Sequence, residues 1–207
     1  MLINEIFNVN EAVANRTVAI YPGRFHPFHK GHKFVYDYLV SKYDAVFIAT
    51  SDKQEDGSPF SFEEKKRMMM LTGVPASAIV NTKQPYVPNE ILDRLDPSNT
   101  AAVFGVGKKD MEENNPRFRV GLKKNGDPTY YQHNKDDRET FDKHGYLEVV
   151  PTQRFKVLGE PATSATELRR QYATLDDEKA KQFIIDLFGK FDQKVMQIMD
   201  QKLNRGQ

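Results

Sequence analysis

Residues 17–32 read T-V-A-I-Y-P-G-R-F-H-P-F-H-K-G-H, and the change of character within this stretch decides the fold. Its first five residues are apolar or β-branched and predict a buried strand. A helix is expected over about 30–42, where apolar side chains recur at helical spacing: Phe34, Val35, Tyr38 and Leu39. The run A-V-F-I-A-T at 45–50 then predicts a second strand, buried on both faces. Strand, helix and strand in this order make a right-handed βαβ unit.

The chain continues to alternate between strand and helix patterns. Ser61-Phe-Glu-Glu64 is typical of a capping box and predicts a helix through Leu71. A further helix is expected near 89–95, and the runs at 101–105 and 146–150 predict two more strands. We therefore expect an α/β fold with a Rossmann-like, doubly wound and mostly parallel sheet.

Three regions depart from this alternation. Residues 111–145 are polar, with Asn125-Gly126-Asp127 as a turn signal, and predict an inserted β-hairpin or mobile flap near the site. Residues 175–207 predict a C-terminal helical segment with one apolar face, which Gly189 could hinge or split. Residues 1–15 form an amphipathic lead, expected to dock on the domain surface or, alternatively, to bind a partner. The main domain is thus expected over 16–174.

The composition limits the class of protein. The 207 residues suffice for one domain with a full core, and 30 Lys plus Arg against 29 Asp plus Glu give a formal net charge of +1. This balance argues against a protein that coats nucleic acid or a membrane, so we expect neither partner. The chain has no cysteine, which excludes disulfides and thiolate chemistry. No run is long enough to span a bilayer and the start lacks a signal-peptide pattern, so we expect a cytoplasmic protein.

Three of the five histidines, His26, His29 and His32, follow the first strand. In an open parallel sheet, ligands bind beyond the carboxyl ends of the strands. The start of the next helix offers free N–H groups and the positive end of a dipole, which favour a phosphate. Gly23 and Gly31 let the backbone approach such a ligand. His29 and His32 project to one side and can donate hydrogen bonds to phosphoryl oxygens as charge gathers on them.

Two other interpretations of the histidines remain open. A metal site would use the same imidazoles, but the stretch has no carboxylate and the helix dipole repels a cation. Ordinary surface histidines are the default for a single residue, yet less expected for two that flank a glycine after a buried strand. We favour the phosphate site and expect no metal bound directly by the protein.

The stretch G-R-F-H-P-F-H-K-G-H at 23–32 resembles the signature of the nucleotidylyltransferase superfamily, whose core is His/Thr-x-Gly-His. It is similar in particular to nicotinamide-mononucleotide adenylyltransferases of the archaeal type and their bacterial and phage relatives. The second family signature, Ser-Ser/Gly-Thr-x-x-Arg, is matched by S-A-T-E-L-R at 164–169, with Ala165 in place of Ser or Gly. Hydroxyls and a guanidinium at a helix start make a second anion site.

Two shorter segments add to the resemblance. P-F-S-F-E-E-K-K-R-M at 59–68 resembles the family's N-P-F-T/S-x-x-E-R segment, and G-V-G-K-K-D at 105–110 resembles its glycine-rich turn beside the nucleotide base. The likeness covers about residues 17–172. It implies that residues 16–174 form a nucleotidylyltransferase domain, and it leaves out the lead and the last helical segment.

The resemblance implies that AMP is transferred from ATP to a phosphorylated acceptor, in the first instance nicotinamide mononucleotide, and that pyrophosphate is released. It assigns catalytic roles to His29, His32 and Arg169, and Mg²⁺ bound through the nucleotide phosphates. The expected nucleotide-binding residues are Gly23, Arg24, Phe25, Lys30, Gly31, Gly105, Lys109, Asp110, Ser164 and Thr166. The expected acceptor-binding residues are His26, which could instead cap the turn, Asp52, and Arg117, which could instead be exposed.

Two alternative functions remain. The first is the same chemistry with CTP and a phosphorylated alcohol, against which the G-R-F-x-P form argues mildly. The second is a binding or structural protein on this fold, within a phage particle, because the start M-L-I-N-E-I-F resembles some phage-encoded relatives. Its location would then be the host cytoplasm or the virion. A homo-oligomer through the last helical segment is a further option for its partners.

Overall fold

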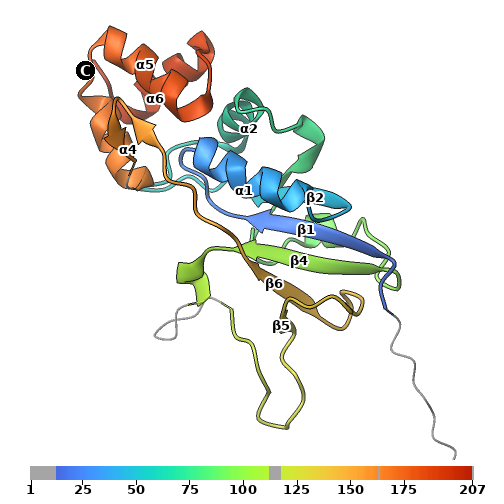
Figure 1. Ribbon diagram of the computed structural model, residues 1–207. Coiled ribbons are helices and arrows are strands. Elements are labelled where there is room, and N and C mark those ends of the chain that lie inside the picture. The colour runs from blue at the N-terminus through green and yellow to red at the C-terminus, as the bar shows by residue number, and fades with distance from the viewer. Residues whose placement is uncertain (1–12, 112–117, 163, 207) are drawn as a thin grey trace, which may run out of the picture.

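The centre of the fold is a six-stranded sheet (Figure 1). The structure is a computed structural model that describes residues 13–111, 118–162 and 164–206. The strands are β1 (Arg16–Pro22), β2 (Ala45–Thr50), β3 (Ile79–Asn81), β4 (Thr100–Val106), β5 (Tyr131–His133) and β6 (Gly145–Val149). They lie in the order β3-β2-β1-β4-β6-β5, and every neighbouring pair is parallel. The predicted doubly wound α/β fold is confirmed, and the strand order reverses between β1 and β4.

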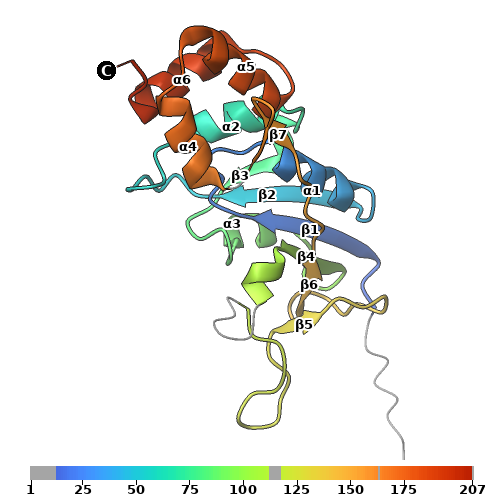
Figure 2. The same cartoon turned by 60° about the vertical axis from the view of Figure 1, so that its left-hand side comes forward.

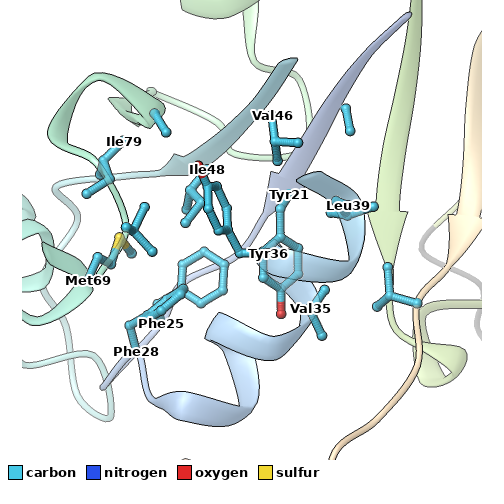
Figure 3. Close-up of a cluster of buried hydrophobic side chains, with 14 of the residues drawn as sticks. Tyr21, Phe25, Phe28, Val35, Tyr36, Leu39, Val46, Ile48, Met69 and Ile79 are labelled. Carbon is cyan, nitrogen blue, oxygen red and sulfur yellow. The ribbon is translucent and has the colours of Figure 1, made fainter. Parts of the chain in front are cut away.

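Each face of the sheet has its own apolar cluster, because successive side chains of a strand point to opposite faces. On β1, Ala19 and Tyr21 face α1 (Lys30–Val40) and α2 (Phe62–Leu71), whereas Ile20 faces the other side. Figure 3 shows the first cluster, where Phe25 and Phe28 from the loop after β1 lie beside side chains of α1 and Met69 of α2. The other face is covered by α3 (Asn89–Leu92) and parts of the insert.

Side-chain caps fix where two of the helices begin. His29 caps α1, and its Nδ1 accepts a hydrogen bond from the Gly31 backbone N–H at 3.2 Å. The predicted capping box of α2 is confirmed, since Ser61 and Glu64 bond reciprocally to each other's backbone N–H groups. All three helices predicted between residues 30 and 95 are present, although α1 ends at Val40 and α3 is shorter than the expected 89–95.

The C-terminal helices form a second body of packing beside α2 (Figure 2). They are α4 (Ala165–Ala173), α5 (Asp177–Phe188) and α6 (Gln193–Leu203). Gly189 splits the predicted 175–205 segment, because it ends α5 in the left-handed conformation with a φ of 88°. Apolar residues of these helices share one cluster with Phe60, Met68 and Leu71. No helix of the described part of the chain is long and apolar enough to cross a bilayer.

The insert differs from the predicted hairpin. The Asn125-Gly126-Asp127 turn is present: the Lys123 N–H donates to the Asp127 carbonyl oxygen, the Gly126 N–H donates to the Lys123 carbonyl oxygen, and Leu122 and Pro128 form an antiparallel bridge. The second arm does not continue the hairpin, because Tyr131–His133 joins the edge of the main sheet as β5, parallel to β6. Of the predicted lead, only residues 13–15 are described, and Val13 bridges to Glu139. The rest of that prediction lies outside the described residues.

The sequence did not predict a small antiparallel pair, β7 (Lys156–Val157) and β8 (Glu160–Pro161). It lies in the segment between β6 and α4, so this segment leads from the carboxyl edge of the sheet to the C-terminal helices (Figure 2).

Candidate active site

A cleft of about 330 Å³ opens at the carboxyl edge of the sheet, where the strand order reverses between β1 and β4. This is the place predicted for the ligand of a doubly wound sheet. The lining residues come from the loop after β1, the start of α1, the segments after β3 and β4, and the segment after β6. They are Tyr21, Pro22, Gly23, Arg24, Phe25, His29, Gly31, His32, Val35, Tyr86, Gly105, Gly107, Asp110, Val150, Pro151, Thr152 and Gln153.

His29 and His32 lie side by side on the cleft wall. Their rings are stacked, with centroids 3.8 Å apart and planes at 23°. Burial lowers the pKa of His29 to about 4, helped by the charge of Lys30 and opposed by a backbone hydrogen bond. Burial, and then His29, hold the pKa of His32 well below its ordinary value. Both rings are therefore neutral at pH 7.

The hydrogen bond to His29 also fixes its tautomer. Because Nδ1 accepts from the Gly31 N–H and the ring is neutral, the ring proton lies on Nε2, which is then a donor. The Nδ1 of His32 is buried and has no hydrogen-bond partner among the described residues. The pair can thus offer neutral imidazole donors at the start of a helix, where an anion is favoured.

Two aromatic side chains hold the histidine pair in place. Phe25, with a φ of 53°, packs its ring edge against His32 at 5.1 Å. A Cβ on Gly23 would lie 2.5 Å from Phe25 Cζ, so the glycine makes room for this ring. Phe155, which the sequence did not predict, packs against His29 with ring centroids 4.9 Å apart, and a Cβ on Gly31 would lie 3.0 Å from Phe155 Cε1.

The structure places His26 behind the cleft wall instead of in it. The residue is 5% exposed, its ring stacks on Phe60, and its Nδ1 accepts from the Phe60 backbone N–H at 3.3 Å. Burial, followed by the charges of Lys65, Arg169 and Arg24, lowers its pKa to about 3. This position favours the turn-capping alternative over contact with an acceptor.

The second motif lies against the first. Arg169 donates to the His26 carbonyl oxygen at 2.6 Å and to Thr166 Oγ1 at 3.3 Å. Ser164 caps α4, with its Oγ accepting from the Glu167 N–H at 3.2 Å. None of these three residues lines the cleft itself.

Two guanidinium groups converge at the junction of the two motifs. Burial lowers the pKa of Arg169, and so does the positive charge of Arg24. The Arg24 side chain is 68% exposed and is 3.7 Å from Glu55. Two neighbouring guanidinium groups favour an anionic ligand, because the ligand would offset their mutual repulsion.

The other predicted site residues differ in where they lie relative to the cleft. Gly105 and Asp110 line the cleft, where Asp110 accepts from the Gly107 N–H at 3.2 Å and Gly105 makes room for Leu39. Lys30 is half-buried, with its Nζ 5.2 Å above the Phe155 ring. Two residues lie away from the cleft: Lys109, which is exposed, and Asp52, which accepts from the Phe62 N–H at 2.6 Å. Arg117 lies outside the described residues.

Lys65 is a supporting residue that sequence reasoning missed. It is 0% exposed and donates to Thr50 Oγ1 at 2.9 Å, to the Arg24 carbonyl oxygen at 3.3 Å and to the Ser51 carbonyl oxygen. Burial lowers its pKa to about 8, opposed by Asp52. One ammonium group thus joins the ends of β1 and β2. The sequence alone carried no signal for this role, because the position of Lys65 on the buried face of α2 is visible only in the structure.

The cleft also includes Tyr86, Thr152 and Gln153, which no motif pointed to. In the described part of the chain, no three His, Asp or Glu side chains gather as a ligand set for a metal ion.

Comparison with known proteins follows the same motifs. The model of the family described as cytidylyltransferase-like matches residues 20–170. The nicotinamide-nucleotide adenylyltransferase of Sulfurisphaera tokodaii is 28% identical over 154 residues, which cover 73% of this chain and 77% of that protein. Nicotinamide-nucleotide adenylyltransferase 1 of Sulfolobus acidocaldarius is 39% identical over 54 residues, 26% of this chain and 31% of that protein.

Among solved structures, the bifunctional NMN adenylyltransferase/ADP ribose pyrophosphatase of Francisella tularensis has a TM-score of 0.51 at 17% identity. The match covers 91% of this chain but spans about half, 51%, of that longer protein. This likeness therefore bears on the fold alone. Because the family model covers both motifs and the sheet that brings them together, the chain is a member of the cytidylyltransferase-like family within the nucleotidylyltransferase superfamily.

Proposed function

We propose that the protein transfers AMP from ATP to nicotinamide mononucleotide and releases pyrophosphate, a step of NAD synthesis. The observation that carries this proposal is the stacked, neutral pair of His29 and His32 at the start of α1, on the wall of the cleft. The relatives named as nicotinamide-nucleotide adenylyltransferases support the choice of ATP and of this acceptor.

The reaction needs positioning and charge stabilisation more than covalent chemistry. The acceptor phosphate attacks the α-phosphorus in line with the departing pyrophosphate. As the P–O bond to pyrophosphate breaks, negative charge grows on the phosphoryl oxygens. We assign His29 and His32 as donors to these oxygens, which stabilise the transition state more than the ground state.

The leaving group is assigned to the junction of the two motifs. The positive charge of Arg24 helps to lower the pKa of Arg169, and Ser164 and Thr166 lie at the start of α4, where Thr166 accepts from Arg169. We assign the β- and γ-phosphates to these groups. We expect Mg²⁺ to enter with ATP and to be held by phosphate oxygens, where it supplies further charge neutralisation.

Pyrophosphate release tests this function directly. Purified protein with Mg²⁺ is supplied with ATP or CTP, each with nicotinamide mononucleotide or with a phosphorylated alcohol. We expect release with ATP and nicotinamide mononucleotide. The variant His32→Ala should lower kcat by about a hundredfold or more, the scale of losing one transition-state donor.

His133→Ala is the matched control, because His133 lies on β5, is exposed, and does not line the cleft. It should keep the wild-type kcat. Near-wild-type turnover in His32→Ala would contradict the assignment of the histidine pair. Turnover with CTP and a phosphorylated alcohol alone would identify a cytidylyltransferase. ATP binding without turnover of any acceptor would instead support the binding or structural role.

A further inference from the structure

The insert between β4 and β6 reaches the cleft through a chain of aromatic contacts. Tyr131 of β5 packs against Phe104 of β4, with ring centroids 5.4 Å apart and planes at 89°. Phe118, which is 3% exposed, packs edge-on against Tyr131 at 4.9 Å and against Tyr86 at 5.8 Å. Of these residues, Tyr86 is the one that lines the cleft.

A hydrogen bond reinforces this chain of contacts. The Tyr131 hydroxyl donates to the Tyr86 backbone oxygen at 3.1 Å, and so joins residues 45 positions apart in the sequence. The ring of Tyr86 therefore contacts Phe118, and its backbone oxygen is held by Tyr131. A half-buried residue held through both its ring and its backbone is preorganised, which lowers the entropy that a ligand must remove on binding.

The position of Tyr86 separates it from the groups assigned to the nucleotide phosphates. The two histidines lie at the start of α1, and α4, which carries Arg169, packs with α2 on the same side. Tyr86 packs against the cluster on the opposite face of the sheet, with Phe118 and Tyr131. The cleft thus has one wall of phosphate-binding groups and one aromatic wall that depends on the insert.

The geometry of in-line transfer indicates whether the acceptor or the pyrophosphate end of ATP lies toward the aromatic wall. The nucleophile must approach the α-phosphorus from the side opposite the leaving pyrophosphate. If pyrophosphate is held at Arg24 and Arg169, the acceptor lies toward the other wall. A planar aromatic base on the acceptor fits against a tyrosine ring, which prefers stacked or edge-on partners.

We propose that two described residues of the insert support the acceptor site: Phe118 and Tyr131 are positioning residues that hold Tyr86 as the wall for the acceptor's aromatic base. This inference rests on the proposed adenylyl transfer and adds to it the segment that selects the acceptor.

The matched pair Tyr131→Phe and Tyr130→Phe tests the proposal. Each variant removes one hydroxyl that donates to a backbone oxygen, since Tyr130 donates to Phe141 at 2.9 Å, and each keeps its ring. Tyr131→Phe should raise KM for nicotinamide mononucleotide by about threefold to tenfold, the scale of one hydrogen bond. KM for ATP and kcat should stay within about twofold. Tyr130→Phe should change none of these values, although its thermal midpoint should fall about as much.

A second variant and a binding measurement complete the test. Phe118→Leu, which keeps an apolar side chain but loses the ring edge, should also raise the acceptor KM. Calorimetric Kd values for nicotinamide mononucleotide, measured for wild type and Tyr131→Phe, need no turnover. If wild type shows no turnover and Tyr131→Phe still binds nicotinamide mononucleotide more weakly than wild type, the result supports this inference and contradicts the proposed reaction. An unchanged acceptor KM and Kd, an equal rise in KM for ATP, or the same effect in Tyr130→Phe would overturn the inference.

Discussion

Burial decides the protonation of the histidines in the loop after β1. His26, His29 and His32 are all held neutral because the charged form would lose hydration there. For His29 and His32, neutrality suits a donor to phosphate that keeps its tautomer across the physiological pH range. His26 is different, because it serves the loop: its Nδ1 accepts from Phe60 and its carbonyl oxygen accepts from Arg169.

His26 should make the protein sensitive to acid. Its folded pKa of about 3 lies below the ordinary value of 6.5. The unfolded chain therefore binds a proton first, and stability present at pH 7 is lost as pH falls from about 6.5 toward 3. His26→Gln keeps an oxygen that can accept from Phe60 but does not titrate. Between pH 7 and pH 5 it should lose about 2 kcal/mol less unfolding free energy than wild type.

Urea denaturation at the two pH values measures this difference. His133→Gln, a substitution at an exposed position outside the loop, is the control. If His26→Gln and wild type lose equal stability between pH 7 and pH 5, His26 is not the buried neutral group described above.

The sequence predicted residues whose chemistry is local and missed those whose role depends on distant partners. His29 and His32 could be proposed because strand end, glycine and helix start are adjacent in the chain, and both line the cleft. The capping role of His26 depends on Phe60, which is 34 residues away in the sequence. The supporting role of Lys65 depends on its hydrogen bond to Arg24, which is 41 residues away. A lysine pattern on a helix indicates a solvated face, so the burial of Lys65 needed the folded structure.

At the scale of elements, α5 and α6 owe their separate boundaries to caps. Gly189 ends α5, and Asp192 begins α6 by accepting from the Val195 N–H at 2.8 Å. The same carboxylate accepts from Arg67 of α2, with Nη2 3.0 Å from Oδ2. One residue thus ends the turn between the two helices and attaches α6 to the main domain.

Asp192→Ala should therefore cost more than the loss of a cap. Asp176 gives the comparison, because it caps α5 by accepting from the Lys179 N–H at 2.8 Å and its ion pair among the described residues is with Lys179 of the same helix. Asp176→Ala should lower the unfolding free energy by the loss of this cap. Asp192→Ala should lose that and about 0.5–1 kcal/mol more, the range for a partly exposed ion pair.

Urea denaturation of both variants, and of each combined with Arg67→Ala, separates the two contributions. The coupling with Arg67 should appear for Asp192 and be absent for Asp176. Equal losses in the two single variants would mean that Arg67 does not help to attach α6.

Strand length explains which elements of the sheet were predictable. The four strands at 17–21, 45–50, 101–105 and 146–150 are mostly apolar and mostly buried runs of five or six residues, and all four are in the parallel sheet. Edge strands β3 and β5 have three residues each, too few to show a period. They form strands because their backbones pair with β2 and β6, which are neighbours only in the folded protein. The hairpin predicted for the insert was wrong in its second arm, because Tyr131–His133 pairs with β6 and not with the first arm.

At the scale of the whole molecule, the fold brings together two motifs from opposite ends of the chain. The bond from Arg169 to the His26 carbonyl oxygen joins residues 143 positions apart. It forms only when the C-terminal helices pack on α2, because α4 belongs to that cluster through Leu168 and Tyr172. The subsite proposed for the leaving group therefore depends on the complete assembly of the sheet and the C-terminal helices.

The assignment of the leaving group to this subsite predicts that Arg169 binds the β- and γ-phosphates of ATP. Arg169→Gln should raise Kd for ATP by about tenfold to a hundredfold, the scale of a hydrogen bond to a charged group. It should leave Kd for AMP within about twofold, because AMP lacks the β- and γ-phosphates. Arg170→Gln is the matched control: it neutralises the next residue of α4, whose side chain is 76% exposed and pairs with Glu167. Calorimetric titration of both nucleotides into the three proteins decides the matter. Equal weakening of ATP and AMP would assign Arg169 to the α-phosphate or to the fold, and the same loss in Arg170→Gln would show that only the overall charge of α4 matters.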